Sequence, residues 1–516
     1  MTADSTSNTP VLIGLGQHVH RPQGPDEAQT PFDLIQTAIA AAEADAGLPS
    51  LAQQIDDLCL VNIISLVHDD PASELAARLG ADPAQKAYTW IGAAAPQWFV
   101  NQAAERIYTG RTKLALICGG EAFRSQRVVA KAQGEASSRP VGPRKKGKDT
   151  AYGGTPRQSW MVGDLRDPIT ELELKYGLMA PLHVYALFEN SLRAHEGLTI
   201  EQQRRELGEF CEKMSGLAAG NPYAWFPKAR TAAEITDTSA QNRMVSFPYT
   251  VNMSAIMAVD QSAAVFMTDA RTAAELGVPE DKWTYVLGTA DAYDIWNVTE
   301  RTDFHSSPSV RTAVDQALLQ AELNLDDIDY LEFYSCFPSA PRITRNMLGL
   351  SKQDPRPLTV TGGLPYFGGP GNNYSLHAVC RMAELCRQNP DKTGLLQSLS
   401  WYISKHSVGV YSGRPGEKPW VPIPSQTYQK DLDGLQGPPV VAEASGPAVV
   451  ETYSLFHDRE GKPVNGVIVG RLEDGSRCLA FAAPEQSLLT ALTEEEFIGR
   501  QGKVKTKDGF NIIDFG

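Results

Sequence analysis

Residues 87–121 read AYTWIGAAAPQWFVNQAAERIYTGRTKLALICGGE, and they predict a strand, a buried helix and a second strand. The run Tyr88 to Ile91 is short and apolar. Pro96 suits the first turn of a helix, where its missing N–H needs no partner, and Gly110 is placed to end that helix. The run Lys113 to Cys118 is almost all apolar, as in a strand buried on both faces. Because few charges interrupt the helix, we expect it inside the protein, with its N-terminal N–H groups at the bottom of a pocket.

Alternating strands and helices flank this stretch on both sides. The pattern predicts repeated β-α-β units and hence a mostly parallel, covered sheet. In the first part, strands are expected at 11–15, 58–65 and 262–268, and helices at 30–46 and 71–79. The order then repeats, with strands expected at 283–289, 330–334, 358–361, 395–403 and 408–411 and helices at 310–322, 339–348 and 373–387.

Two further regions depart from this alternation. Between 122 and 243 the pattern predicts an insertion over the sheet, with a basic loop at 124–148 and helices at 180–195 and 199–219. Past Pro415 the chain becomes proline-rich, as linkers are. Residues 440–515 then alternate or are rich in β-forming residues, with turn signals between the runs. They predict a small β-barrel of about five strands, of the OB type in topology only.

Composition limits the classes of function. The net charge of −14 disfavours non-specific binding to nucleic acid or to an anionic membrane. No apolar run approaches the ~18 residues of a membrane span, and the first ten residues lack the pattern of a signal peptide. The seven cysteines are scattered and form no C-x-x-C pair. We therefore expect a cytoplasmic protein with reduced thiols and without a metal site or nucleic-acid partner.

Several motifs resemble those of thiolases. The thiolase pattern Ile-x-x-Gly, followed by an apolar strand ending in Gly-Gly-x-Glu, is similar to Ile107 to Gly110 and to Gly119-Gly120-Glu121. The resemblance implies an α/β protein with the duplicated five-layer α-β-α-β-α thiolase fold. It places the N-terminal half at 1–122 and 244–275, the loop insertion at 123–243 and the C-terminal half at 276–418. The β-rich domain at 430–516 resembles the extension of thiolase-like protein type 1.

The three positions that act in thiolases are altered here. Counting back from Ile107 puts the acyl-accepting cysteine at Ala93, and no Cys, Ser or Thr lies between Trp90 and Trp98. The catalytic His of the Gly-His-Pro loop corresponds to Gly369, and the basic Cys corresponds to Ile403. Loss of the nucleophile alone would exclude a covalent acyl-enzyme.

Other residues are candidates for the remaining chemistry. The segment 332–337 ends a predicted strand, where Tyr334 can donate an O–H to a thioester oxygen and Cys336 is either an acid or an inert buried thiol. His377 follows the glycine-rich loop and either points into the pocket or is an ordinary helix residue. His406 beside Lys405 is the best candidate for acid–base work, with a structural role as the alternative.

The resemblance also implies residues that bind substrate. It places Ala93, Ala94, Gly368 and Gly369 beside the thioester, because glycine-rich loops expose N–H groups. Met179 and His183 resemble the segment that lines the acyl channel, although core packing is an equal alternative for His183. The basic loop supplies Arg139, Arg144 and Lys145 for the phosphates of CoA, unless it is simply a solvated charge run.

Two functions follow from these observations. The first is an acyltransferase-superfamily enzyme, similar to acetyl-CoA acetyltransferases of lipid metabolism, that cleaves or forms a C–C bond next to a thioester without a covalent intermediate. The second is a non-catalytic acyl-CoA-binding or scaffold protein of thiolase fold. Both take a CoA thioester as ligand and need no other cofactor. The chain would be a monomer or homodimer, and its C-terminal domain offers a surface for a protein partner.

Overall fold

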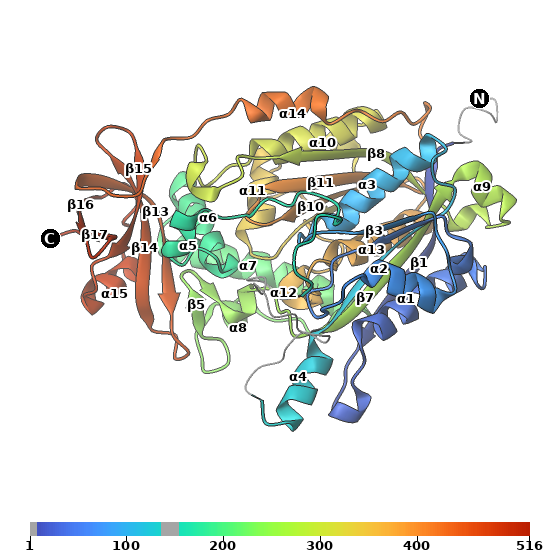
Figure 1. Ribbon diagram of the computed structural model, residues 1–516. Helices are drawn as coiled ribbons and strands as arrows, with labels where there is room; N and C mark the ends of the chain where they lie inside the picture. The colour runs from blue at the N-terminus through green and yellow to red at the C-terminus, as the bar shows by residue number, and fades with distance from the viewer. Residues whose placement is uncertain (1–7, 136–153) are drawn as a thin grey trace.

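The computed structural model describes residues 8–135 and 154–516 (Figure 1). Nine strands form one sheet in the order β3-β2-β4-β7-β1-β8-β11-β10-β9. Its two halves meet where β1 pairs with β8 through Val11 and Leu12. The strands are β1 (Pro10–His20), β2 (Asp57–Leu60), β3 (Gln85–Tyr88), β4 (Ala115–Ala122), β7 (Asp260–Asp269), β8 (Thr284–Tyr293), β9 (Tyr330–Phe333), β10 (Thr393–Ser400) and β11 (Lys405–Ser412).

Helices complete the five layers that the sequence predicted. α3 (Ala95–Tyr108) and α13 (Tyr374–Gln388) lie between the two halves of the sheet and contact strands of both. α1 (Pro31–Ala46) covers the outer face of the first half, and α10 (Pro308–Ala321) covers that of the second (Figure 1). The chain therefore has the predicted duplicated α-β-α-β-α fold, with α3 in its central layer.

A glycine in each half lets the outer helix approach the sheet. A Cβ on Gly16 of β1 would overlap the carbonyl oxygen of Ala38 in α1, and one on Gly288 of β8 would overlap that of Ala317 in α10. Both helices therefore pack on the strand backbone itself, at positions where only glycine fits.

The sheet is mixed, so the prediction of a mostly parallel sheet is wrong. Within this nine-stranded sheet of the described residues, only β2–β3, β2–β4 and β9–β10 are parallel neighbours. The pairs β4–β7, β1–β7, β8–β11 and β10–β11 are antiparallel. The reason is clearest at β10 and β11, because the short turn at 401–404 can join only antiparallel neighbours.

Two local predictions also need correction. The predicted strand at 358–361 is a loop, because this segment wraps a buried carboxylate: Glu332 accepts the N–H of Val360 at 2.8 Å and that of Thr361 at 3.2 Å. The described part of the basic loop forms a helix, α4 (Phe123–Ala132). Its start is held by the Asp260 carboxylate, which accepts the N–H groups of Arg124 and Ser125.

The insertion adds mainly helices that bridge the sheet and the C-terminal domain. α6 (Pro181–His195) is buried along most of its length. The remaining helices are α5 (Glu171–Lys175), α7 (Ile200–Ala219) and α8 (Ala232–Thr236). Glu189 of α6 forms a buried ion pair with Arg342 of α11 (Ser339–Met347), which links the insertion to the second half of the sheet.

The C-terminal domain is the predicted five-stranded barrel. Its strands close in the order β13-β14-β15-β17-β16 and back to β13. They are β13 (Gly446–His457), β14 (Pro463–Leu472), β15 (Arg477–Ala482), β16 (Gln501–Lys507) and β17 (Phe510–Asp514), with α15 (Gln486–Glu494) between β15 and β16. The barrel packs on α6, where Thr452 donates to the carbonyl of Leu187 and Asn190 donates to that of Tyr453.

Candidate functional site

The turn that begins α3 is held by side chains from other layers. The Gly92 N–H donates to Asn372 Oδ1 at 2.9 Å, and the Ala94 N–H donates to Ser400 Oγ at 2.8 Å. The N–H of Ala95 donates to the Gly92 carbonyl at 3.0 Å. Three N–H groups that were expected to face a ligand therefore have acceptors within the protein.

Ala93 differs from its neighbours in this turn. It is partly exposed, whereas the residues on either side of it are buried. Its methyl packs against an apolar cluster that also contains Tyr334, Cys336 and Ile403. Ala93 and Ile403, which the resemblance to thiolases matches to the nucleophile and the basic Cys, thus pack in one apolar cluster, where Ala93 offers only a methyl group.

The Gly119-Gly120-Glu121 motif helps to hold the loops beside the start of α3. The Glu121 carboxylate accepts the N–H groups of Ile64 and Ser65, both at 2.8 Å. Burial raises the pKa of Glu121 to about 7. A Cβ on Gly371 would overlap the same carboxylate, so the loop before α13 approaches it closely. The motif thus has a structural role in positioning two loops beside α3.

Tyr334 and Cys336 lie directly after β9 and are neutral hydrogen-bond donors. Burial raises the pKa of Cys336 to about 12, and the pKa of Tyr334 lies well above its usual value for the same reason. The Tyr334 ring packs edge-on against Tyr374, with 5.5 Å between centroids. At neutral pH neither group is a base or an anionic nucleophile.

His406 lies on the face of β11 away from α3. Its Nδ1 is 2.9 Å from Gln397 Nε2, and its Nε2 is 3.1 Å from the hydroxyl of Ser307 at the start of α10. Burial lowers the pKa of His406 to about 4, so the ring is neutral. Because strand side chains alternate between faces, Lys405 and Ser407 point toward α3 instead.

The other two candidate histidines contact neighbouring elements. His377 Nδ1 is 2.9 Å from Gln17 Oε1 of β1, its buried Nε2 has no partner, and burial lowers its pKa to about 3. The His183 ring lies 3.7 Å from that of Phe456 in the barrel, and burial lowers its pKa to about 4. The ring of His183 therefore contacts the C-terminal domain.

The glycine-rich loop is packed more tightly than the sequence predicted. The Gly368 N–H donates to the Leu364 carbonyl at 3.2 Å, and the Gly369 N–H donates to that of Ile256 at 2.9 Å. A Cβ on Gly368 would overlap Gln261 Oε1. The expectation that these N–H groups are open to a ligand is therefore wrong. The Met179 carbonyl accepts the hydroxyl of Tyr402 in the 401–404 turn.

The described cations of the basic segment line a recess beside α4. Arg124, Arg127 and Lys131 recur along α4, and Gly24 and Pro25 form the opposite wall. Arg139, Arg144 and Lys145 lie outside the described residues.

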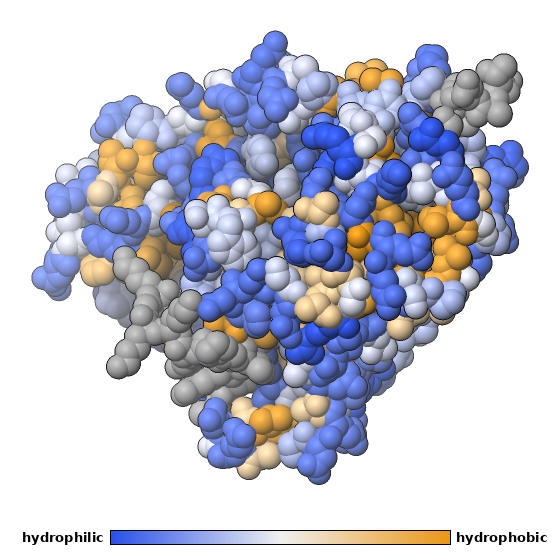
Figure 2. All heavy atoms as spheres, turned by 45° about the vertical axis from the view of Figure 1, so that its right-hand side comes forward, coloured by the Kyte–Doolittle hydropathy of each residue, from blue (hydrophilic) through white to orange (hydrophobic). Residues whose placement is uncertain are grey.

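The face in Figure 2 is largely hydrophilic, with hydrophobic residues in separated patches.

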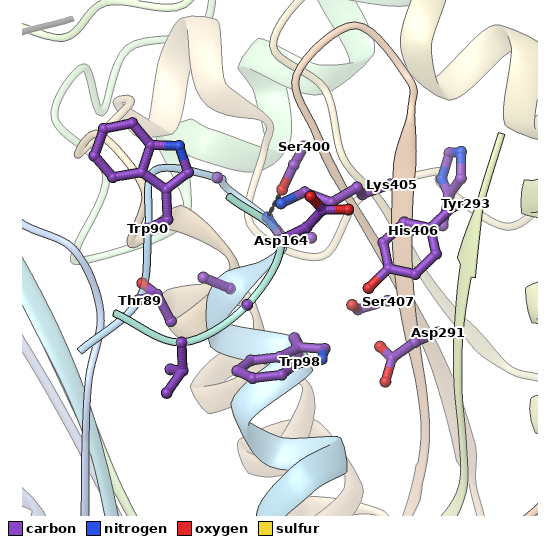
Figure 3. A pocket seen from close by; sticks show the side chains of 15 residues that line it. Thr89, Trp90, Trp98, Asp164, Asp291, Tyr293, Ser400, Lys405, His406 and Ser407 are labelled. Carbon is purple, nitrogen blue, oxygen red and sulfur yellow. Dashed lines mark hydrogen bonds between the residues drawn. The ribbon is translucent and has the colours of Figure 1, made fainter. Parts of the chain in front are cut away.

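A pocket that the sequence analysis missed lies on the other side of the α3 turn. Lys405, Asp164 and Asp291 line it (Figure 3). The sequence could have indicated part of this pocket, because side chains alternate along a strand. Those of residues 405 and 407 therefore lie on one face of β11 and that of residue 406 lies on the other. The contribution of Asp164 depends on tertiary structure alone.

Residues 8–135 and 154–516 contain neither a metal-binding cluster nor a membrane-spanning helix. Within these ranges no group of three or more His, Cys, Asp or Glu side chains is arranged to hold a metal ion. No helix in the same ranges is both long and apolar enough to cross a membrane.

Comparison with known proteins shows which family this is. Residues 428–509 match the family described as thiolase-like protein type 1 additional C-terminal domain. A monomeric SCP2-thiolase-like protein type 1 from Mycobacterium smegmatis is 31% identical, with 99% of both chains covered and a TM-score of 0.83. The Ltp2-ChsH2(DUF35) aldolase has a TM-score of 0.59 at 16% identity, covering 79% of this chain and 99% of that one, and shows the fold alone. Acetyl-CoA acetyltransferase from Methanocaldococcus jannaschii is 22% identical over 62% of this chain and 71% of its own length. The chain therefore belongs to the thiolase superfamily, among the thiolase-like proteins of type 1 that carry an additional C-terminal domain.

Proposed function

We propose that this protein binds a CoA thioester at the start of α3 without forming an acyl-enzyme. The observation that carries the proposal is Ala93, which is the partly exposed residue of the turn and contacts the cluster of Tyr334 and Cys336. An alanine methyl cannot accept an acyl group, so a thioester that reaches this point stays intact.

The surrounding groups favour binding over acyl transfer. The raised pKa of Cys336, about 12, leaves very little thiolate at pH 7. His406 faces Ser307, on the other side of the sheet from α3. The protonated thiol of Cys336 and the phenol of Tyr334 remain as donors for a thioester carbonyl.

Cations on α4 support recognition of the CoA phosphates. Arg124, Arg127 and Lys131 line one recess, and arginine forks suit phosphate oxygens. Arg139, Arg144 and Lys145 follow in the sequence and would add to this charge. The same surface would hold the nucleotide part of the ligand while the thioester lies beside Ala93.

One observation favours a second candidate, C–C bond cleavage or formation next to the thioester. Cys336 lies near the phenols of Tyr185 and Tyr334. Because Tyr185 donates its hydroxyl to the Trp401 carbonyl at 2.8 Å, Tyr334 and the Cys336 thiol are the donors for a ligand. Such donors would stabilise negative charge on a thioester oxygen without any covalent intermediate. One protein of the same fold is named an aldolase, but at 16% identity it supports the fold and not the reaction.

The test combines calorimetric titration with intact-mass measurement, using CoA and acetyl-CoA. The natural protein should bind both ligands and gain no mass. Ala93→Cys should keep binding and gain the mass of one acetyl group, because its thiol would stand at a helix N-terminus. Ala94→Cys is the matched control, because this neighbouring methyl is buried and should stay unmodified.

Three results would oppose the proposal. Absence of binding would remove the site. An acetyl adduct on the natural protein would show that another nucleophile acts, and peptide mapping would test Cys336 first. Binding by Ala93→Cys without an adduct would show that the thioester lies elsewhere. Substrate consumption without an adduct, lost in Tyr334→Phe, would instead select the second candidate.

A further inference from the structure

A group of polar side chains lies on the face of the sheet that packs against α3. β8 and β11 are antiparallel there, with Lys405 opposite Tyr293 and Ser407 opposite Asp291. All four side chains share one face because positions two apart in a strand point the same way.

These side chains form one wall of a pocket (Figure 3). Trp98 of α3, Trp90 and the segment 162–164 enclose the other sides. The cavity is small, with a volume of about 30 Å³. It has room for about two water molecules, so it fits only a molecule of a few heavy atoms.

The Lys405 amine is the reactive group of this pocket. Nζ has no hydrogen-bond or ion-pair partner among residues 8–135 and 154–516, and lies 5.7 Å from the Trp296 ring centroid. Asp164 is engaged by Arg166, with its carboxylate 2.6 Å from Nη2 and 2.9 Å from Nε. The Asp164 carboxylate is thus already paired with another cation.

The surroundings favour the neutral form of this amine. Burial lowers the pKa of Lys405 to about 8; the Asp164 carboxylate opposes this shift and Arg166 adds to it. Asp291 and Tyr293 face it from β8, and burial raises the pKa of Asp291 to about 7. At pH 7.5 roughly a quarter of Lys405 would be neutral, against about 0.1% of an ordinary lysine. Nucleophilic lysines in enzymes are activated in this way, by desolvation and by a neighbouring cation.

The lining favours a neutral electrophile over an anion. Two carboxylates, Asp164 and Asp291, would repel an anion in so small a space. A carbonyl oxygen has a donor available, because Ser400 Oγ accepts the Ala94 N–H and keeps its own proton for a ligand. We propose that this pocket is a reactive-lysine site in which Lys405 Nζ forms an imine with a small aldehyde or ketone.

The reaction balances without any redox step. The Nζ lone pair attacks the carbonyl carbon, a C–N bond forms and the oxygen takes up a proton. The resulting carbinolamine loses its hydroxyl as water, and the nitrogen gives up its remaining protons as the C=N bond forms. The net change is amine plus carbonyl compound giving imine plus water. Ala93 itself does not line this pocket, although its neighbours Gly92 and Ala94 do, and imine formation needs no CoA.

The test traps the imine on the full-length protein. Propanal or acetone is added with sodium cyanoborohydride at several pH values, and each lysine is followed by peptide mass mapping. Lys282 is the matched reference, because it is also half-buried but pairs with Asp45 at 3.2 Å. At pH 7.5 Lys405 should be alkylated at least ~10-fold faster than Lys282, with a rate that levels off above pH 8.

A variant series completes the experiment. Lys405→Arg should lose only the adduct at position 405, whereas Lys282→Arg should leave that adduct unchanged. Labelling of Lys405 no faster than Lys282 would overturn the proposal. So would preferential labelling whose rate keeps rising to pH 10, because such an amine would have an ordinary pKa. The rate ratio within the natural protein decides the matter even if a variant fails to fold.

Discussion

Arg477 of β15 holds the barrel against the thiolase body, and replacing it should loosen that contact. The side chain is fully buried, and its Nη1 donates to the carbonyls of Thr299 and Arg301, each at 2.6 Å. The guanidinium also pairs with Glu451 at 2.6 Å. Arg477→Met would leave two buried carbonyls and one carboxylate without this partner.

The magnitude follows from these lost contacts. An unsatisfied buried acceptor costs ~1–3 kcal/mol, and removing one member of a buried ion pair costs ~3–5 kcal/mol. Glu451 keeps its second partner, Arg471, which limits the loss. We therefore expect about 3–4 kcal/mol, which corresponds to a roughly 100- to 1,000-fold increase in the opening of this contact.

Native-state hydrogen exchange measures that opening directly. Peptides covering 298–304 and 446–482 should lose protection in Arg477→Met, while those of α3 and α13 should not. Arg471→Met is the matched control, since Arg471 contacts the same Glu451 but is 30% exposed and should cost less than ~1 kcal/mol. Equal exchange in the two variants, or loss of protection across the whole chain, would refute the reasoning.

Three further predictions test the fold and the site. Gly16→Ala should destabilise the protein by more than ~2 kcal/mol in thermal unfolding, because its Cβ would overlap Ala38. The control Gly24→Ala has open space around it and should change stability by less than ~0.5 kcal/mol. The pKa of Glu121 is raised to about 7, so its carboxyl binds a proton more tightly in the folded state than in the unfolded state. The free energy of unfolding should therefore fall as the pH rises from 4.5 to 7. Denaturant titrations at several pH values should show that Glu121→Gln flattens this fall. An unchanged slope would contradict this. Arg127→Glu should weaken CoA binding roughly 5-fold at low salt and less at high salt. Arg111 pairs with Glu105 at the far end of α3, so the control Arg111→Glu should leave CoA binding unchanged. Equal effects of the two reversals would remove the α4 recess from the binding site.

Local patterns predicted much of the fold because they act over a few residues. Thr30 and Pro31 marked the start of α1, where the structure shows a capping box between Thr30 and Asp33, and a left-handed Gly47 ends the helix. The apolar run after Gly110 became β4, buried along its whole length. Strand direction was not predictable in this way, since it depends on which distant segments become neighbours. Residues 358–361 showed the same limit, because a buried Glu332 draws them out of the sheet.

Motif spacing and residue identity were enough to predict the thiolase fold with an added barrel, and they predict that Ala93 stands where thiolases have their nucleophile. What the neighbouring side chains can do depends on the folded chain. His406 was the preferred base, yet its ring faces Ser307 on the far side of the sheet, while Lys405 faces the pocket beside α3. The pKa of a side chain depends on its burial and on charges from distant segments, such as Asp164 and Arg166 beside Lys405. Those neighbours meet only when the chain has folded.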